Sequence, residues 1–239
     1  METRQPRLSV VIPALEEEHW LPLLLQDLTT QDRRPDEVIV VDGGSTDRTR
    51  ELAAAAGATV ILSERGVGRQ RDLGGKSATG DLLVFFDSDV RLEPTTLSRL
   101  EACFLSQGCD VACPRYRPWQ SSRIIRAGFV FFNYLFRLFQ YLSPSGAGCC
   151  IVVRKAHFEK IGGFRHDTVY DDIAFIRTAG RHGRFRMLPV DVFVSDRRFR
   201  KEGTMIVFGR WLMLAPFFFL GIFNVERLIP YRFAHYGKK

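Results

Sequence analysis

Two aspartates, Asp87 and Asp89, follow a run of apolar residues at positions 82–86. A continuous apolar run of this length predicts a strand that is buried on both faces of a sheet. Ligands of open α/β sheets bind beyond the carboxyl ends of the strands, so this pair is placed to contact a substrate. Two carboxylates spaced i and i+2 can share one hard divalent cation, which keeps positions open for phosphate oxygens. The alternative is a polar turn, because aspartate is a common turn residue.

The segments around this pair alternate between strand and helix patterns. Short runs of apolar and β-branched residues predict strands at 8–13, 37–41, 59–62, 81–86 and 149–153. Apolar residues at helical spacing predict helices at 16–28, 47–56, 68–78, 155–161 and 171–182. This alternation implies right-handed βαβ units and an α/β fold with a mostly parallel sheet flanked by helices. Glu17, Asp42 and the Asp87–Asp89 pair are then expected to converge on one edge of the sheet.

The composition is that of a globular protein, since 46% of the 239 residues are hydrophobic and 26% are charged. This length allows one large α/β domain or two small ones. The net charge of +7 points to an anionic partner: nucleic acid, an acidic membrane surface or a phosphorylated substrate. The five cysteines show no C-x-x-C spacing, and the first six residues hold no apolar leader. We therefore expect free thiols and a cytoplasmic location.

Asp42 ends the strand predicted at 37–41, and Gly43 and Gly44 follow it. A carboxylate in this position can accept a hydrogen bond from the N–H of a base or from ribose hydroxyls, and glycines allow a close approach of the backbone. The G-x-G-x-x-G pattern of dinucleotide-binding proteins is absent. The alternative is a simple turn with Ser45 or Asp47 as the cap of the next helix.

Several segments, in order along the chain, resemble the motifs of family 2 glycosyltransferases. The segments are SVVIPALEE at 9–17, VVDGGSTDRT at 40–49, RDLG at 71–74, ATGD at 78–81, DSD at 87–89, GGF at 162–164 followed by Asp171 and Asp172, and SDRRF at 195–199 followed by Gly203. The last of them is similar to the downstream basic motif of one bacterial subgroup. Each match is short, but together they cover nearly the whole chain in the order of the family.

The resemblance implies a GT-A fold and an inverting, hexosyltransferase-type enzyme. It implies a nucleotide-diphosphate-sugar donor linked through UDP or GDP, Mg²⁺ or Mn²⁺ as cofactor, and a lipid or glycan acceptor. The donor-binding residues that it implies are Pro13, Glu17, Asp42, Gly43, Arg71, Asp87, Ser88, Arg197 and Arg198. Asp89, together with Asp87, would ligate the metal. Asp172, with Asp171 beside it, would be the catalytic base, while Asp42 would read the base of the nucleotide.

Elementary chemistry agrees with these roles. Sugar transfer expels a diphosphate, and a metal ion neutralises the charge that develops on it. Asp172, in the first turn of a predicted helix, is placed to accept the proton of an incoming hydroxyl. Arg197 and Arg198 could bind the diphosphate in a bidentate manner. The alternatives are stabilisation of a helix N-terminus by Asp171 and Asp172, and a solvated basic face for the two arginines.

Two positions depart from the family pattern. Glu16 and Asp72 stand where the family often has asparagine. We expect both side chains to add negative charge near the bound diphosphate.

We divide the chain into a GT-A domain at 1–203, with a nucleotide-binding half at 1–115 and an acceptor half at 116–203, and an apolar and basic C-terminal segment at 204–239. Two stretches, 127–142 and 205–225, are rich in apolar and aromatic residues. The first is too short to span a bilayer, and the second holds Arg210 and Pro216. We expect helices that lie on an anionic membrane surface, so that the protein is peripherally associated with the membrane. A single span, a buried core helix and an oligomer interface remain as alternatives.

Two other functional classes compete with sugar transfer. A nucleotidyltransferase on a similar sheet would need a basic, glycine-rich loop after the first strand, whereas positions 16–18 are all glutamate. A nucleic-acid-binding protein would need basic residues interleaved with aromatic residues on one face. The acidic residues expected at the sheet edge argue against it, so we expect no nucleic-acid partner.

Overall fold

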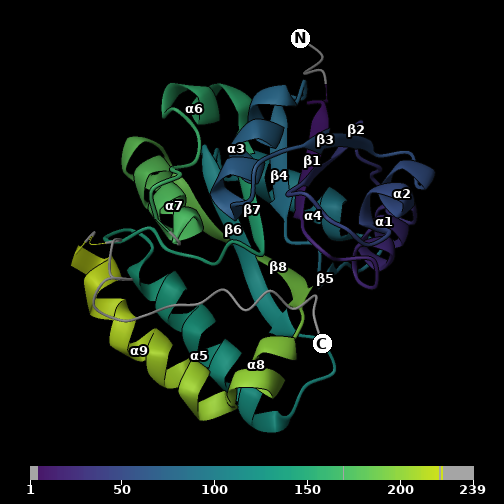
Figure 1. Ribbon diagram of the computed structural model, residues 1–239. Helices are drawn as coiled ribbons and strands as arrows, with labels where there is room; N and C mark the ends of the chain where they lie inside the picture. The colour runs from purple at the N-terminus through teal and green to yellow at the C-terminus, as the bar shows by residue number, and fades with distance from the viewer. Residues whose placement is uncertain (1–4, 169, 221, 223–239) are drawn as a thin grey trace.

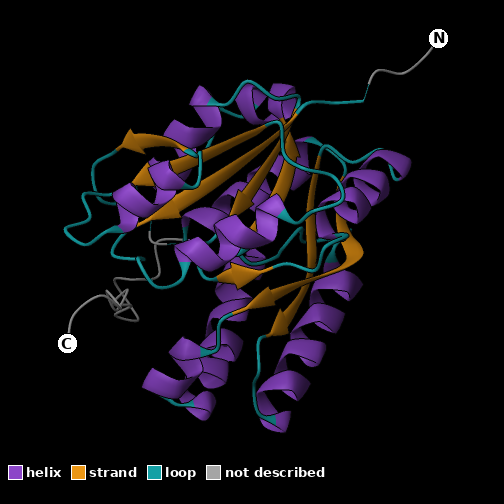
Figure 2. Ribbon diagram, turned by 90° about the vertical axis from the view of Figure 1, so that its right-hand side faces the viewer, coloured by secondary structure: helices purple, strands orange, loops and turns teal. Residues whose placement is uncertain are grey.

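A curved sheet of eight strands runs through the described part of the chain, and helices flank it (Figures 1 and 2). The structure is a computed structural model that describes residues 5–168, 170–220 and 222. The strand order in the sheet is β3-β2-β1-β4-β7-β6-β8-β5. The strands are β1 (Leu8–Ala14), β2 (Glu37–Asp42), β3 (Thr59–Leu62), β4 (Leu82–Phe86), β5 (Val90–Arg91), β6 (Val111–Pro118), β7 (Cys150–Arg154) and β8 (Phe185–Val194).

The sheet is parallel at one end and mixed at the other. β1 pairs in parallel with β2 and β4, and β2 pairs in parallel with β3. β7 runs antiparallel to both β4 and β6, while β6 and β8 are parallel and β5 is antiparallel to β8. The expected α/β fold with a mostly parallel sheet is confirmed, and β7 is the strand at which the direction first changes.

The helices alternate with the strands along the first part of the chain and cluster near its end. They are α1 (Leu21–Thr29), α2 (Thr49–Ala55), α3 (Val67–Ser77), α4 (Thr96–Ser106), α5 (Arg123–Phe139), α6 (Lys155–Lys160), α7 (Asp171–His182), α8 (Arg197–Glu202) and α9 (Thr204–Leu220). In both views α5, α8 and α9 lie together below the sheet (Figures 1 and 2). These three helices therefore extend the protein beyond the carboxyl ends of β1 and β4.

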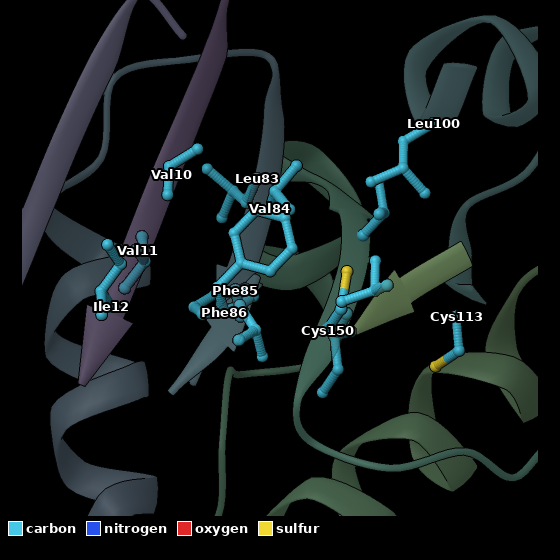
Figure 3. Close-up of a cluster of buried hydrophobic side chains, with 14 of the residues drawn as sticks. Val10, Val11, Ile12, Leu83, Val84, Phe85, Phe86, Leu100, Cys113 and Cys150 are labelled. Carbon is cyan, nitrogen blue, oxygen red and sulfur yellow. The ribbon is translucent and has the colours of Figure 1, made fainter. Parts of the chain in front are cut away.

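The core forms where β4 lies between β1 and β7 (Figure 3). All five residues of β4 are buried, and Val84 and Phe85 pair in register with Val10 and Val11 of β1. Because helices cover both faces of this part of the sheet, the strand has no polar side and reads as a continuous apolar run. This burial fixes the point at which β4 ends, and so fixes the position of the acidic residues that follow it.

Helix α3 packs unusually close to the parallel strands. A Cβ atom at Gly74 would overlap the side chains of Val11 on β1 and Val41 on β2, so a larger residue would push the helix away from the sheet. Arg71, one turn earlier on the same helix, is thereby held at the carboxyl ends of the strands. The close packing of α3 on the sheet requires glycine at position 74, and this packing also sets the position of Arg71 in the site.

The elements predicted from β1 to β4 match the structure closely, with one shifted boundary. The helix expected at 16–28 begins only at Leu21, because Glu16 has a φ of 57° and the residues after it form a turn. We did not predict α4, β5, β6, β8 or α8. β6 carries Pro114 and arginines at alternate positions, and β8 contains Pro189, which is why neither reads as a strand from its residues alone.

The two aromatic stretches form α5 and α9. Asn133, which interrupts the apolar pattern of α5, accepts from the backbone N–H of Tyr116 over 3.0 Å and donates to the Tyr116 carbonyl over 2.8 Å. Among the described residues, no helix is both long enough and apolar enough to cross a membrane. The predicted apolar stretch at 205–225 and the predicted segment at 204–239 extend past residue 220, where 221 and 223–239 lie outside the described residues.

Candidate active site

One cleft collects most of the residues that we singled out from the sequence. It has a volume of about 1370 Å³ and is lined by the residues that follow β1 and β4 and by the first turns of α3, α7 and α8. The predicted site residues that line it are Pro13, Glu17, Arg71, Asp87, Ser88, Asp89, Asp171, Asp172, Arg197 and Arg198. The expected convergence of acidic strand ends on one edge therefore holds for Glu17, Asp87 and Asp89.

Asp42 and Gly43 do not line this cleft. Asp42 is fully buried, and its Oδ2 atom accepts hydrogen bonds from the N–H groups of Gly44 and Ser45, each over 2.9 Å. Its Oδ1 atom is buried without a hydrogen-bond partner in the structure. An unpartnered buried acceptor is unusual in folded proteins, so this atom is the one that Asp42 could offer to a ligand donor.

Arg71 links the end of β4 to the start of α7. Its Nη2 atom donates to Asp87 Oδ1 over 2.6 Å, and its Nη1 atom donates to Asp171 Oδ2 over 2.8 Å. The guanidinium also lies 5.8 Å from the centre of the Phe164 ring. Burial disfavours the charge on Arg71, but Asp171 and Asp87 outweigh it and hold its pKa above the ordinary value. Arg71 is therefore a fixed cation at the centre of the cleft.

Arg197, at the start of α8, joins the acidic residues beyond β1 and β4. It forms a bidentate pair with Glu17, at 2.6 and 3.1 Å, and its Nε atom donates to Asp89 Oδ2 over 2.9 Å. Its guanidinium lies 5.6 Å from the centre of the Trp20 ring. Burial raises the pKa of Asp89 to about 6, although Arg197 opposes that shift. The neighbouring Arg198 pairs instead with Glu202 within α8.

Asp172 lies in the first turn of α7 and faces the loop before β7. Its Oδ2 atom accepts from the N–H of Gly148 over 2.7 Å, and its Oδ1 atom accepts from the N–H of Ile173 over 2.8 Å. Burial raises the pKa of Asp172, while Arg71 and these N–H groups oppose the shift. Burial likewise raises the pKa of the adjacent Asp171, to about 6. A carboxylate with a raised pKa is a stronger proton acceptor, which suits a general base.

The cleft is rich in negative charge. Its acidic lining residues are Glu17, Glu64, Asp87, Asp89, Asp167, Asp171, Asp172 and Glu202, and its arginines are Arg65, Arg69, Arg71, Arg197 and Arg198. Within the described residues, no three histidine, cysteine, aspartate or glutamate side chains are grouped so that they could hold a metal ion by themselves. Mg²⁺ is commonly held by one or two carboxylates together with substrate phosphates. Asp87 and Asp89 fit that kind of shared site.

A family model described as "Glycosyl transferase family 2" matches residues 9–193. The chain belongs to this family. The resemblance found in the sequence motifs is confirmed, and with it the GT-A fold and the assignment to the glycosyltransferase class of enzymes. The match covers the cleft residues from Pro13 to Asp172, whereas Arg197 and Arg198 follow its last residue.

Two curated relatives and one solved structure illustrate the range of this family. The chain is 27% identical over 202 residues to an undecaprenyl-phosphate 4-deoxy-4-formamido-L-arabinose transferase of Pectobacterium carotovorum, which covers 80% of this chain and 60% of the relative. It is 32% identical over 187 residues to a 4,4'-diaponeurosporenoate glycosyltransferase of Staphylococcus haemolyticus, covering 75% of this chain and 48% of the relative. The chain thus spans about half of the length of the curated relatives it matches.

The solved structure is the mannosyltransferase PcManGT from Pyrobaculum calidifontis in complex with GDP-Man and Mn²⁺. It superposes with a TM-score of 0.63 at 22% sequence identity, covering 80% of this chain and 57% of that chain. At this level of identity the likeness shows that the two proteins share a fold.

Both departures from the family pattern have a structural role. Glu16 accepts from the N–H and the hydroxyl of Thr46, and so ties the turn after β1 to the turn after β2. Asp72 pairs with Lys76 and His166 and accepts from the N–H of Phe164. Neither side chain lines the cleft, so neither contacts a ligand there directly, and an effect of their charges on a bound diphosphate stays a prediction.

Sequence reasoning missed two residues that shape the family 2 cleft. Gln70 donates from Nε2 to the carbonyls of Ala14 and Val41, and so holds the ends of β1 and β2 together. A Cβ atom at Gly148 would lie 2.6 Å from Arg71 Nη2 and 2.7 Å from Asp172 Oδ2, so only glycine fits between them. The glycines of the SPSGAG segment at 143–148 were a visible signal, but nothing local says which side chains they face.

Proposed function

We propose that this family 2 domain transfers a sugar, with inversion, from a nucleotide-diphosphate sugar to a lipid or glycan acceptor in a metal-dependent reaction. The observation that carries the proposal is the Arg71 bridge. Arg71 pairs with both Asp87 and Asp171 in one cleft. Asp87 is close in sequence to the metal-ligand candidate Asp89, and Asp171 is next to the base candidate Asp172. The same cleft therefore offers a place for a leaving diphosphate and a proton acceptor for an incoming nucleophile.

In this proposal Asp89 and Asp87 hold a Mg²⁺ or Mn²⁺ ion together with the donor diphosphate, and the ion supplies neutralisation of the charge that develops on the leaving group. The excess of carboxylates in the cleft supports this role, because a dianionic diphosphate would otherwise be repelled. The Mn²⁺ in the complex of the similar mannosyltransferase supports it as well. Arg197 and Arg198 line the same cleft, and in this proposal they contact phosphate oxygens.

The nucleoside is assigned to the region beyond β1 and β2. Pro13 and Glu17 line the cleft there, and Asp42 ends β2 with Gly43 after it. Asp42 then reads the base through its Oδ1 atom, which has no hydrogen-bond partner in the structure. The nucleotide is UDP or GDP, and Ser88 lies between the two metal-ligand candidates to contact the donor.

Asp172 is the general base of the proposed reaction. It takes the proton of an acceptor hydroxyl as the acceptor oxygen bonds to the anomeric carbon, while the bond from that carbon to the diphosphate breaks on the opposite face. The dipole of α7 favours a carboxylate at this position, and Arg71 adds a nearby positive charge. Asp171 holds Arg71 in place and thereby positions both halves of the site.

Membrane association is supported by the outer faces of α5 and α9. Their exposed apolar residues include Val130, Phe131, Tyr134, Leu138, Met205, Ile206, Met213 and Leu220. The exposed arginines Arg123, Arg126 and Arg137 lie on α5 among them. An exposed apolar surface with basic residues is typical of a protein that lies on an anionic bilayer. The names of both curated relatives point to lipid-like acceptors, so we place the enzyme on the cytoplasmic face of the membrane.

The test is an Asp89→Ala variant assayed with nucleotide sugars and a membrane extract as acceptor. Transfer should require Mg²⁺ or Mn²⁺ in the wild type and should fall by at least about 10³-fold in the variant, the effect of losing several kcal/mol of charge stabilisation. The control is Asp191→Ala, because Asp191 pairs with Arg115 and Arg117 outside the cleft and should leave turnover intact. Full activity of Asp89→Ala in the presence of a chelator would show that the metal role is wrong.

A further inference from the structure

The cleft has a second arm beyond the catalytic carboxylates. Helix α5 bounds one side of it and helix α9 the other, and the two helices lie next to each other in both views (Figures 1 and 2). The side chains of this arm include Leu135, Phe136 and Phe139 from α5 and Leu214, Ala215 and Phe218 from α9. The whole cleft, at about 1370 Å³, is larger than the roughly 300–1,000 Å³ of a typical small-molecule site, so it has room for more than a donor.

Aromatic contacts hold α9 at its middle and near its C-terminal end, which gives the arm a defined shape. Near α8, Trp211 packs edge-on against Phe129 and Phe132 of α5, with ring centres 6.0 and 5.0 Å apart. Near α7, Phe218 packs against Tyr170, with ring centres 4.9 Å apart. Tyr170 directly precedes Asp171 and Asp172. The arm therefore ends at the carboxylate that the proposed reaction uses as its base.

The lining that α5 and α9 contribute contains no charged side chain among the described residues. Asn133 is the polar residue of α5 in this lining, and its amide is already engaged on both atoms by the backbone of Tyr116. A glycan in this arm would bury hydroxyl groups without partners, and each unpartnered group costs about 1–3 kcal/mol. An apolar chain has no such penalty and gains free energy as it leaves water.

We propose that the acceptor is an amphiphilic lipid whose apolar chain lies between α5 and α9 while its head group presents an oxygen nucleophile beside Asp172. This inference rests on the proposed function and selects the lipid from the two acceptor classes left open there. The exposed apolar residues on the outer faces of the same two helices place the mouth of the arm next to a bilayer. A lipid acceptor can then enter the arm without its chain crossing water.

Calorimetric titration of the full chain with dodecyl phosphate and butyl phosphate, both below micellar concentrations, tests the arm directly. The two probes share a head group and differ in chain length. Because each buried methylene contributes roughly 0.8 kcal/mol, or about a fourfold gain, dodecyl phosphate should bind at least about a hundredfold more tightly than butyl phosphate. Equal affinities for the two probes would overturn the proposal.

Two pairs of variants show where the chain binds. Ala215 lines the cleft and Met213 does not, although both are exposed; Ala215→Trp should weaken dodecyl phosphate binding by at least about tenfold, whereas Met213→Trp should not. On α5, Phe139 lines the cleft and the neighbouring Leu138 does not, so Phe139→Ala should weaken binding and Leu138→Ala is its control. If the outer-face variants weaken binding as much as the arm variants, the chain binds the surface and the proposal is wrong.

A titration with UDP- and GDP-sugars in the presence of Mn²⁺ separates this inference from the function on which it rests. If a nucleotide sugar binds but the affinity for the alkyl phosphates does not depend on chain length, the lipid proposal is wrong and the proposed transfer reaction still stands. If affinity for the alkyl phosphates depends on chain length but no nucleotide sugar binds, the proposed transfer reaction is wrong. The arm would then bind apolar chains for another purpose, so the acceptor proposal would be wrong as well.

Discussion

The Nε atom of Arg197 donates to Oδ2 of Asp89 over 2.9 Å, although the two residues are 108 positions apart in the chain. The same guanidinium forms a bidentate pair with Glu17. One side chain from the start of α8 therefore neutralises acidic residues beyond both β1 and β4. A metal ion with a bound diphosphate would compete with Arg197 for Asp89, so donor binding should release this arginine toward the phosphates.

The first prediction concerns the Arg197→Met variant, which leaves Glu17 and Asp89 without their cation. In the absence of metal, its free energy of unfolding should be about 1.5–3 kcal/mol lower than that of the wild type, the usual contribution of hydrogen bonds to charged groups. Millimolar Mn²⁺ without nucleotide should then stabilise the variant more than the wild type, because the two carboxylates are free to bind it. Thermal unfolding with and without Mn²⁺ measures both effects.

Arg198→Met is the matched control for that experiment. Arg198 pairs with Glu202 of the same helix, so its loss leaves the Arg197 contacts to Asp89 and Glu17 unchanged. An equal Mn²⁺ effect in the two variants would show that Arg197 does not occupy the place of the metal.

The second prediction is that Gly148→Ala lowers turnover. The added Cβ atom would lie 2.6 Å from Arg71 Nη2 and 2.7 Å from Asp172 Oδ2, so both side chains must shift. A displacement of about 1 Å in a reacting group can cost about 10²-fold in rate. Steady-state kinetics with the purified chain measure the loss. Gly209→Ala is the control, because a Cβ atom there meets nothing within 4 Å and should leave turnover unchanged.

Local sequence patterns were sufficient for the elements from β1 to β4 and for the identity of many site residues. The end of β4 could be predicted because Phe86 is followed directly by Asp87, and the start of α7 could be predicted because Asp171 and Asp172 suit a helix N-terminus. These are statements about neighbours along the chain. They place each residue on an element, but they do not say which residue on another element it contacts.

The pairings within the site depend on contacts between distant segments. Arg71 and Asp171 are 100 positions apart, and Arg197 and Glu17 are 180 apart, so neither pair has a local signal. The assignment of Arg197 to the diphosphate did not anticipate its contact with two carboxylates. The same limit applies to β6 and β8, where long-range pairing forms strands despite Pro114 and Pro189.

The third prediction concerns the pH dependence of kcat/KM. Burial raises the pKa of Asp171 to about 6 and also raises that of Asp172, and the two adjacent carboxyls titrate as a pair. A general base must be ionised, so kcat/KM should fall as the pH drops through the raised pKa of this carboxyl pair and should level off above it. Rates measured between about pH 5 and 8 at saturating Mn²⁺ provide the profile. A flat profile over this range would argue against an ionisable base in the α7 turn.

The last prediction separates the two kinds of lipid head group through Asp172→Asn. With a hydroxyl acceptor, the variant should lose about 10²–10⁴-fold in turnover, the usual contribution of general base catalysis. With a phosphate acceptor the loss should be far smaller, because a phosphate oxygen is already ionised and needs no base. Donor affinity should barely change in either case, since the lost interaction belongs to the transition state. Single-turnover transfer to membrane extract, compared with calorimetric donor binding, measures both quantities. A loss confined to donor binding, with turnover intact, would show that Asp172 is not the base.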